Sequence, residues 1–125
     1  MGPSESINRV LNTFFNGFGI PGYLEDNIPP AASLPYLTYK PAAPGGWNEE
    51  ASFHGRLWYP SSAGRLPILQ TEDKISAALA GGLTVPCEGG AILLRKGTPW
   101  AQPMDNPPEG YLCEYLNFEI TQLCE

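Results

Sequence analysis

A stripe of large apolar residues near the amino terminus constrains the fold of this chain more than any other feature. Its members recur three or four positions apart, the spacing that places side chains on one face of an α-helix. They are Ile7, Val10, Leu11, Phe14, Phe15 and Phe18. Ser4 is a suitable N-cap, and Pro21 prevents continuation, so the helix is expected to end at Gly17 or Gly19. Three phenylalanines on one stripe require a sheet or another element to cover them.

A second helix is predicted from about residue 65 to residue 80. Pro67 is acceptable in its first turn, and Gly81-Gly82 supplies a left-handed stop. The residues expected to face the core are Ile68, Ile75, Ala78 and Leu79. The residues expected to face water are Gln70, Glu72, Asp73 and Lys74.

Five β-type runs complete the pattern. They span 34–40, 51–59, 83–85, 91–96 and 111 to about 123. In the second and the last of these runs, apolar and polar residues alternate with the period of a strand. Glu114 is an exception, because it falls on the apolar side of the last run. Two long loops rich in glycine and proline are predicted at Pro41–Glu50 and Gly97–Gly110.

These elements predict an α+β fold. Strands that follow one another in sequence favour antiparallel pairing, and the helices need a sheet face to bury their stripes. We therefore predict a single domain spanning 1–125, with a four- to five-stranded, mostly antiparallel (mixed) sheet and two helices packed on one face. The length of 125 residues fits one domain of ordinary size.

Charge and cysteine content argue against several classes of function. A net charge of −6 with scattered Lys and Arg is unsuited to nucleic acid, which needs clustered positive charge. Cys87, Cys113 and Cys124 lack C-x-x-C spacing, and their odd number is typical of reduced cytosolic thiols. A Cys113–Cys124 or Cys87–Cys113 bond requires that their Cα atoms come close. The sequence has no signal-peptide pattern and no apolar run of ~20 residues, so no membrane partner is expected.

The chain carries little of the chemistry that catalysis needs, and we predict no catalytic, cofactor-binding or metal-binding residues. His54 is the single histidine, and it lies on the polar side of a strand, as a surface residue does. Glu49 and Glu50 are adjacent carboxylates at a loop tip, an arrangement typical of solvated groups. The three Gly-Gly pairs match no phosphate-binding pattern. We expect a protein that is not an enzyme and uses no cofactors.

The tryptophans leave alternatives open. Trp58 falls in a strand and is expected to pack there. Trp47 and Trp100 fall in the two long loops, where an exposed indole is costly, so each either folds back or contacts another subunit. Charged residues make up only 16% of the chain, and a surface so poor in charge favours subunit contacts.

Several short segments follow one another in a familiar order. They are Phe15-Asn16-Gly17-Phe18-Gly19-Ile20-Pro21, Leu34-Pro35-Tyr36-Leu37-Thr38-Tyr39, Leu57-Trp58-Tyr59, Gly89-Gly90-Ala91-Ile92, Arg95-Lys96-Gly97-Thr98-Pro99-Trp100-Ala101-Gln102 and Tyr115-Leu116-Asn117-Phe118-Glu119. Over nearly the whole chain, this order and spacing resemble the tail terminator (tail completion, head–tail neck) proteins of long-tailed bacteriophages and prophages.

The resemblance implies a structural protein of the virion tail or neck, made in the cytoplasm of the bacterial host. Proteins of this family form a homohexameric ring at the head-proximal end of the tail tube. The ring stops polymerisation of the major tail protein and offers a docking surface for the head–tail connector, or head completion protein. DNA passes through the lumen only as cargo, and no cofactor takes part.

A closed ring needs two different patches on each subunit, and the two long loops are where we expect them. The predicted interface residues are Trp47, Asn48, Glu49, Glu50, Arg95, Thr98, Trp100, Gln102 and Met104. Two alternatives remain open. One is a small-ligand binding module that uses the loop aromatics around a closed apolar pocket. The other is an enzyme with His54 within hydrogen-bond reach of Glu49 or Glu50.

Overall fold

A curled, mixed β-sheet forms the centre of the computed structural model, which describes residues 3–42, 44 and 48–124. In this described part the sheet has six strands, in the order β1-β2-β3-β6-β5-β4. They are β1 (Gly22–Leu24), β2 (Tyr36–Tyr39), β3 (Glu50–Pro60), β4 (Leu83–Cys87), β5 (Gly90–Pro103) and β6 (Tyr111–Cys124). β1 and β2 are parallel and the other neighbours are antiparallel. The predicted α+β class is confirmed.

The predicted number of strands was too low because β1 was missed. β1 has three residues and lies within the segment 19–33, which is rich in proline and reads as irregular. Three residues are too few to show alternation. β1 pairs in register with β2, with Gly22 opposite Leu37.

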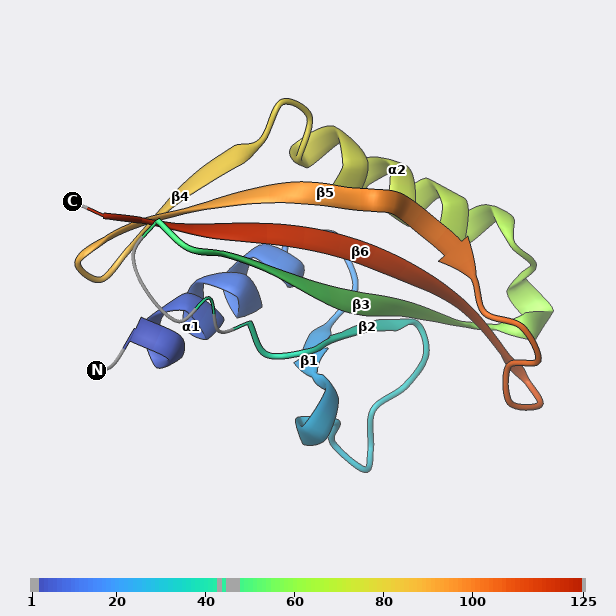
Figure 1. Cartoon of the computed structure of the whole chain (residues 1–125). Helices are drawn as coiled ribbons and strands as arrows, with labels where there is room; N and C mark the ends of the chain where they lie inside the picture. The colour runs from blue at the N-terminus through green and yellow to red at the C-terminus, as the bar shows by residue number, and fades with distance from the viewer. Residues whose placement is uncertain (1–2, 43, 45–47, 125) are drawn as a thin grey trace.

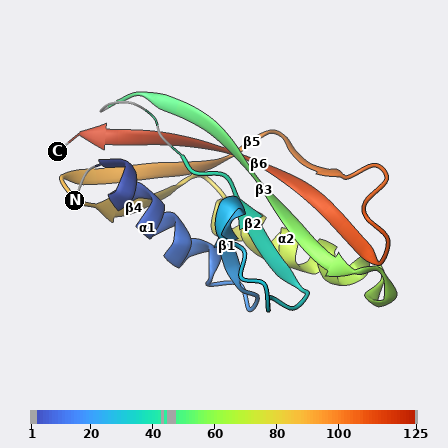
Figure 2. The same ribbon diagram turned by 90° about the horizontal axis from the view of Figure 1, so that it is seen from below.

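Two helices cover one face of the sheet, as predicted (Figures 1 and 2). They are α1 (Pro3–Phe15) and α2 (Leu66–Ala78). Phe53 and Tyr59 point to the same face of β3 because they are an even number of residues apart. The Phe53 ring packs 6.3 Å from the ring of Phe15 on α1, and the Tyr59 hydroxyl hydrogen-bonds Thr71 on α2.

The core between helices and sheet is built around aromatic rings. Phe118 on β6 is fully buried, and its ring centroid lies 5.0 Å from Phe53 and 5.2 Å from Phe15. Phe15 also packs 4.7 Å from Tyr39 on β2. The stripe on α1 is therefore buried against the sheet, although the helix ends at Phe15, earlier than predicted, and Phe18 packs beyond its end at 5.1 Å from Phe14.

A row of asparagines on α1 and just after its end fastens this helix to β1, to β2 and to the segment that follows β2. Asn8 Nδ2 donates to Ala42 O at 3.0 Å, and Ala42 N donates back to Asn8 Oδ1 at 3.1 Å. Asn16 makes the same pair of hydrogen bonds with Gly22: its Oδ1 accepts from Gly22 N at 2.9 Å, and its Nδ2 donates to Gly22 O at 3.2 Å. Asn12 Nδ2 donates to the Tyr39 hydroxyl at 3.0 Å. The four-residue spacing brings all three amides to one side of the helix.

The second predicted loop is partly wrong, because β5 continues to Pro103. The strand register shifts between Lys96 and Ala101, which is where Pro99 interrupts the sequence pattern. A β-bulge absorbs the extra residues and lets the strand resume pairing with β6. Gly97 comes close to β6 at this point: a Cβ added there meets Asn117 Cβ at 2.9 Å.

Candidate interaction surface

The face of the sheet opposite the helices carries the polar half of each alternating strand. On β3 these residues are Glu50, Ser52, His54, Arg56 and Trp58, and on β6 they include Tyr115, Asn117, Glu119 and Thr121. Antiparallel pairing sets His54 opposite Asn117 and Arg56 opposite Tyr115. Neither α1 nor α2 lies over this face (Figure 2). We refer to it as the helix-free face.

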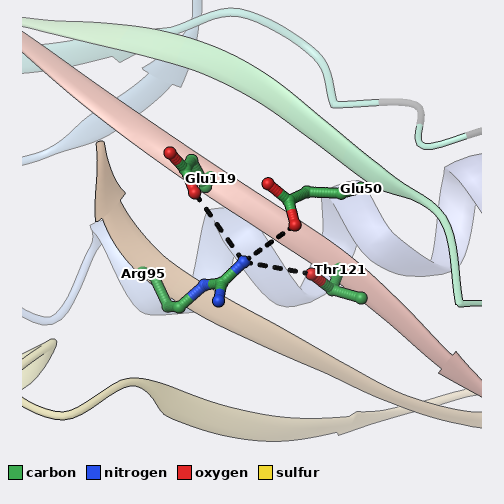
Figure 3. Close-up of polar contacts among 4 residues, drawn as sticks. All are labelled: Glu50, Arg95, Glu119 and Thr121. Atoms are coloured by element: carbon green, nitrogen blue, oxygen red, sulfur yellow. Dashed lines mark hydrogen bonds and ion pairs between the residues drawn. The ribbon is translucent and has the colours of Figure 1, made fainter. Parts of the chain in front are cut away.

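Arg95 joins three strands at one end of the helix-free face (Figure 3). Its Nη2 lies 3.0 Å from Glu50 Oε2 on β3 and 3.7 Å from Glu119 Oε2 on β6. The same nitrogen is 3.5 Å from Thr121 Oγ1. One cation thus holds two carboxylates that would otherwise repel each other. Because the Arg95 side chain is 40% exposed, this cluster is accessible to a partner.

A second ionic cluster lies on the same face towards the β1 edge. Arg56 Nη1 is 2.6 Å from Glu25 Oε1, and Lys40 Nζ is 3.3 Å from Glu25 Oε2. The Arg56 guanidinium also lies 5.2 Å from the ring centroid of Tyr115, within cation–π range. Here two cations share one carboxylate, so the two clusters differ in composition.

Aromatic side chains fill the space near the second cluster. The Trp58 ring lies 5.9 Å from Tyr111, and its Nε1 donates to Thr38 Oγ1 at 3.0 Å. Tyr23 and Tyr36 make an edge-to-face pair at 5.9 Å. These rings are half-buried, and the prediction that Trp58 packs within the sheet is confirmed.

Two shallow grooves open on the helix-free face beside the bulge in β5. One, of about 420 Å³, is bordered by polar side chains that include His54, Thr98, Gln102 and Asn117. The other, of about 530 Å³, is bordered by Gln102, Met104 and Tyr115. Asn117 Nδ2 donates to Pro99 O at 2.9 Å, which fixes the wall between strand and bulge. A third groove, of about 770 Å³, lies beside α1 and Tyr39. All three are open rather than the closed apolar pocket that the small-ligand alternative requires.

His54 has surroundings that keep it neutral. Partial burial lowers its pKa from 6.5, and the positive charges of Arg56 and Lys40 lower it further, with Glu25 opposing them. Glu50 lies four residues away on the same strand, about 13 Å by the rise of an extended chain. The Glu50 carboxylate pairs with Arg95, so the His54–Glu50 contact that the enzyme alternative requires is not formed.

The structure brings several predicted interface residues to one surface. Glu50 and Arg95 join the first ionic cluster, while Thr98, Gln102 and Met104 border the grooves. Asn48 and Glu49 continue the pairing of β3 with β6, because Asn48 N donates to Gln122 O and Gln122 N donates to Glu49 O. Trp47 lies outside the described residues.

Of the two alternatives left open for Trp100, folding back or contacting another subunit, the structure shows the first. Trp100 lies on β5 and its ring packs edge-on against Phe118 at 5.4 Å, so it has folded back onto the core. Arg56, Tyr115 and Glu119 also belong to the surface, although they were not predicted there. Their alternation with buried residues was visible, but their partners come from strands far away in the sequence.

Neither a metal centre nor a membrane-spanning helix emerges from the described chain. Across residues 3–42, 44 and 48–124, no group of three or more His, Cys, Asp and Glu residues is placed to hold a metal ion. Within those same ranges, no helix is long and apolar enough to cross a membrane.

Cys87 and Cys113 carry free thiols, so the Cys87–Cys113 bond considered from the sequence is not formed.

Comparison with known proteins gives the fold and no function. No family model and no curated protein matches this sequence. One solved structure, whose name describes no activity, aligns with a TM-score of 0.59 over 97% of this chain and 94% of its own. The two sequences are 16% identical, so the likeness concerns the fold alone.

Proposed function

We propose that this chain is a structural tail terminator or neck protein of a long-tailed phage or prophage. In this role it caps the head-proximal end of the tail tube as a homo-oligomeric ring and joins it to the head connector. It works by making contacts and not by catalysis. The class of protein comes from the order of segments that resembles the family; the structure supplies a surface suited to such contacts.

The observation that carries the proposal is the helix-free face. Arg, Trp and Tyr are the residue types that most often dominate protein interfaces, and this face carries Arg56, Arg95, Trp58 and Tyr115. Their partners hold them in place, as Glu25 holds Arg56 and Glu50 holds Arg95. Side chains that are already ordered lose less conformational entropy when a partner binds.

The two ionic clusters also suit a ring. Head-to-tail contact requires two unlike patches on each subunit. The cluster around Arg56 lies towards β1, and the cluster around Arg95 lies on the β5 side of the sheet. They differ in their ratio of cations to carboxylates, so one subunit presents two chemically different patches.

The test is assembly of tail tubes in the presence of the purified chain. A major tail protein from the same genome is allowed to polymerise with and without this chain, and the tubes are imaged by electron microscopy. We expect a ring at one end of each tube and shorter tubes as the chain is added. Uncapped tubes of unchanged length, together with a monomer in light scattering, contradict the proposal.

A matched pair of charge reversals tests the surface itself. Arg95→Glu places a third carboxylate beside Glu50 and Glu119 and should reduce capping at least tenfold, since like charges that meet at an interface cost several kcal/mol. Lys74→Glu makes the same charge change on the exposed side of α2 and should leave capping unchanged. Equal effects of the two variants place the contact elsewhere.

A further inference from the structure

The contact between α2 and the sheet contains two carboxyl groups that face each other. Glu114 falls on the apolar side of β6, and only 7% of its side chain is exposed. Glu72 lies on α2 four residues after Ile68 and one after Thr71, both buried. It was predicted to face water, and that prediction is wrong. Positions 68, 71, 72 and 75 form one helical face, so Glu72 shares the side that packs on the sheet.

One cation, Arg65, lies beside this pair of carboxyl groups. Arg65, just before α2, places Nη1 2.9 Å from Glu114 Oε1. Glu72 Oε1 is buried and receives no hydrogen bond from any described donor. A buried carboxylate oxygen without a donor is strongly disfavoured, whereas a protonated carboxyl can donate to the neighbouring carboxylate. With Arg65 neutralising Glu114, the proton belongs on Glu72.

The electrostatics agree with this geometry. The pKa of Glu72 is raised to about 8, first by burial, then by the hydrogen bond to Glu114 and the negative charge of Glu114; Asp73 adds to the rise and Arg65 opposes it. The other elements around α2 contribute Tyr59 of β3, whose hydroxyl bonds Thr71, and Lys96 of β5, whose Nζ bonds Ser76 Oγ at 2.9 Å.

We propose that Glu72 and Glu114 form a proton-dependent latch that holds α2 on the sheet, closed while Glu72 keeps its proton and weakened when that proton leaves. Loss of the proton puts two negative charges opposite the single Arg65, in a contact where Glu114 is nearly buried and water screens the charges less than at the open surface. The latch lies on the helix side of the sheet and is independent of the proposed tail function.

The direction of the pH effect follows from linkage. When α2 is separated from the sheet (undocked), Glu72 has its ordinary pKa of 4.5. When α2 is packed on the sheet (docked), the pKa of Glu72 is about 8. The docked state therefore binds one more proton between these two values, and its stability falls as pH rises through this window, by at most about tenfold per pH unit. Below the window and above about pH 8 the effect levels off. His54, on the other face, has a lowered pKa and contributes with the opposite slope up to about its unfolded pKa of 6.5.

Two measurements on the full chain test the latch. The first follows the Glu72 side-chain carboxyl carbon by NMR from pH 4 to pH 10. We expect a midpoint near 8, which moves lower in Glu114→Gln but stays above the ordinary value because burial of Glu72 remains. A wild-type midpoint below 5.5 overturns the proposal, and this measurement needs no variant to fold.

The second measurement is hydrogen exchange of the α2 amides from pH 5 to pH 9, expressed as protection factors and compared with α1. In the wild type, protection of α2 should fall with pH up to about 8 and then level off. Glu72→Gln keeps a neutral donor and should remove this dependence. Asp73→Asn, which changes an exposed neighbour, should keep the pH dependence, with only a slightly lower midpoint because Asp73 makes a small contribution to the raised pKa of Glu72. A pH dependence that persists in Glu72→Gln refutes the latch.

Discussion

Asn16 offers the sharpest test of how α1 is attached to the sheet. It follows the last residue of α1, and its amide holds both backbone groups of Gly22 at the start of β1. Its Nδ2 also caps the helix end by donating to Asn12 O at 2.7 Å. Gly22 itself is buried, and a Cβ there would meet Phe15 at 3.0 Å. The substitution Asn16→Ala removes every one of these hydrogen bonds while leaving the backbone in place.

The magnitude follows from those bonds. A net contribution of about 1 kcal/mol for each of the two contacts with Gly22 gives about 2 kcal/mol. The substitution leaves the buried Gly22 N–H without an acceptor, which supports a loss of unfolding free energy of this size. Gly22 O is less affected, because Asn12 Nδ2 at 3.4 Å can still donate to it. With a urea m-value of roughly 2 kcal/mol per molar, the unfolding midpoint should fall by about 1 M.

The assay is urea unfolding followed by circular dichroism and by tryptophan fluorescence. Thr13→Ala is the matched control, because the Thr13 hydroxyl bonds only Arg9 O within the same helix, at 3.3 Å, and its loss should change stability by less than about 0.5 kcal/mol. Asn16→Asp keeps the acceptor for Gly22 N, so its urea midpoint should lie between those of Asn16→Ala and Thr13→Ala. If Asn16→Ala and Thr13→Ala unfold at the same urea concentration, the asparagine row does not fasten the helix.

Three further substitutions or reactions test other parts of the structure. Gly97→Ala should lower stability by about 1–3 kcal/mol in the same urea assay, because its Cβ has no room beside Asn117, whereas Thr98→Ala next to it should have little effect. Phe118→Ala should cost about 3–5 kcal/mol, measured by thermal unfolding, because it empties the centre of the aromatic core. Cys113 should resist alkylation at pH 8 until the protein unfolds, since burial raises the pKa of its thiol to about 12; rapid labelling of the native protein, detected by peptide mass spectrometry, contradicts this environment.

Much of the fold could be predicted because it rests on local periodicity. The α1 stripe and the alternation of β3 and β6 each identify a buried face from neighbouring residues. The position of Glu114 on the apolar side of β6 was also visible in the sequence. Its partners could not be predicted, because Arg65 and Glu72 lie more than forty residues away in the sequence.

The predictions failed where tertiary contacts override local signals. Pro99 indicates a break, yet β5 passes it by means of a bulge that the pairing with β6 stabilises. β1 forms because β2 pairs with its three residues and Asn16 holds Gly22 at its start, whereas three residues are too short a run to be recognised as a strand. The candidate surface was predicted mainly from two loops. Thr98 and Gln102 instead lie on a strand, as Arg95 was predicted to, and all three act together with residues of β3 and β6.

The two outermost strands limit how copies of this molecule can meet. β1 is three residues long and β4 contains Pro86, which has no N–H to offer. Edges this short or interrupted are poor templates for another chain and protect against uncontrolled stacking into fibrils. A ring of the kind proposed would therefore join its subunits through side-chain contacts rather than by adding strands to the sheet, and substitutions of surface residues would be enough to change the number of copies it contains.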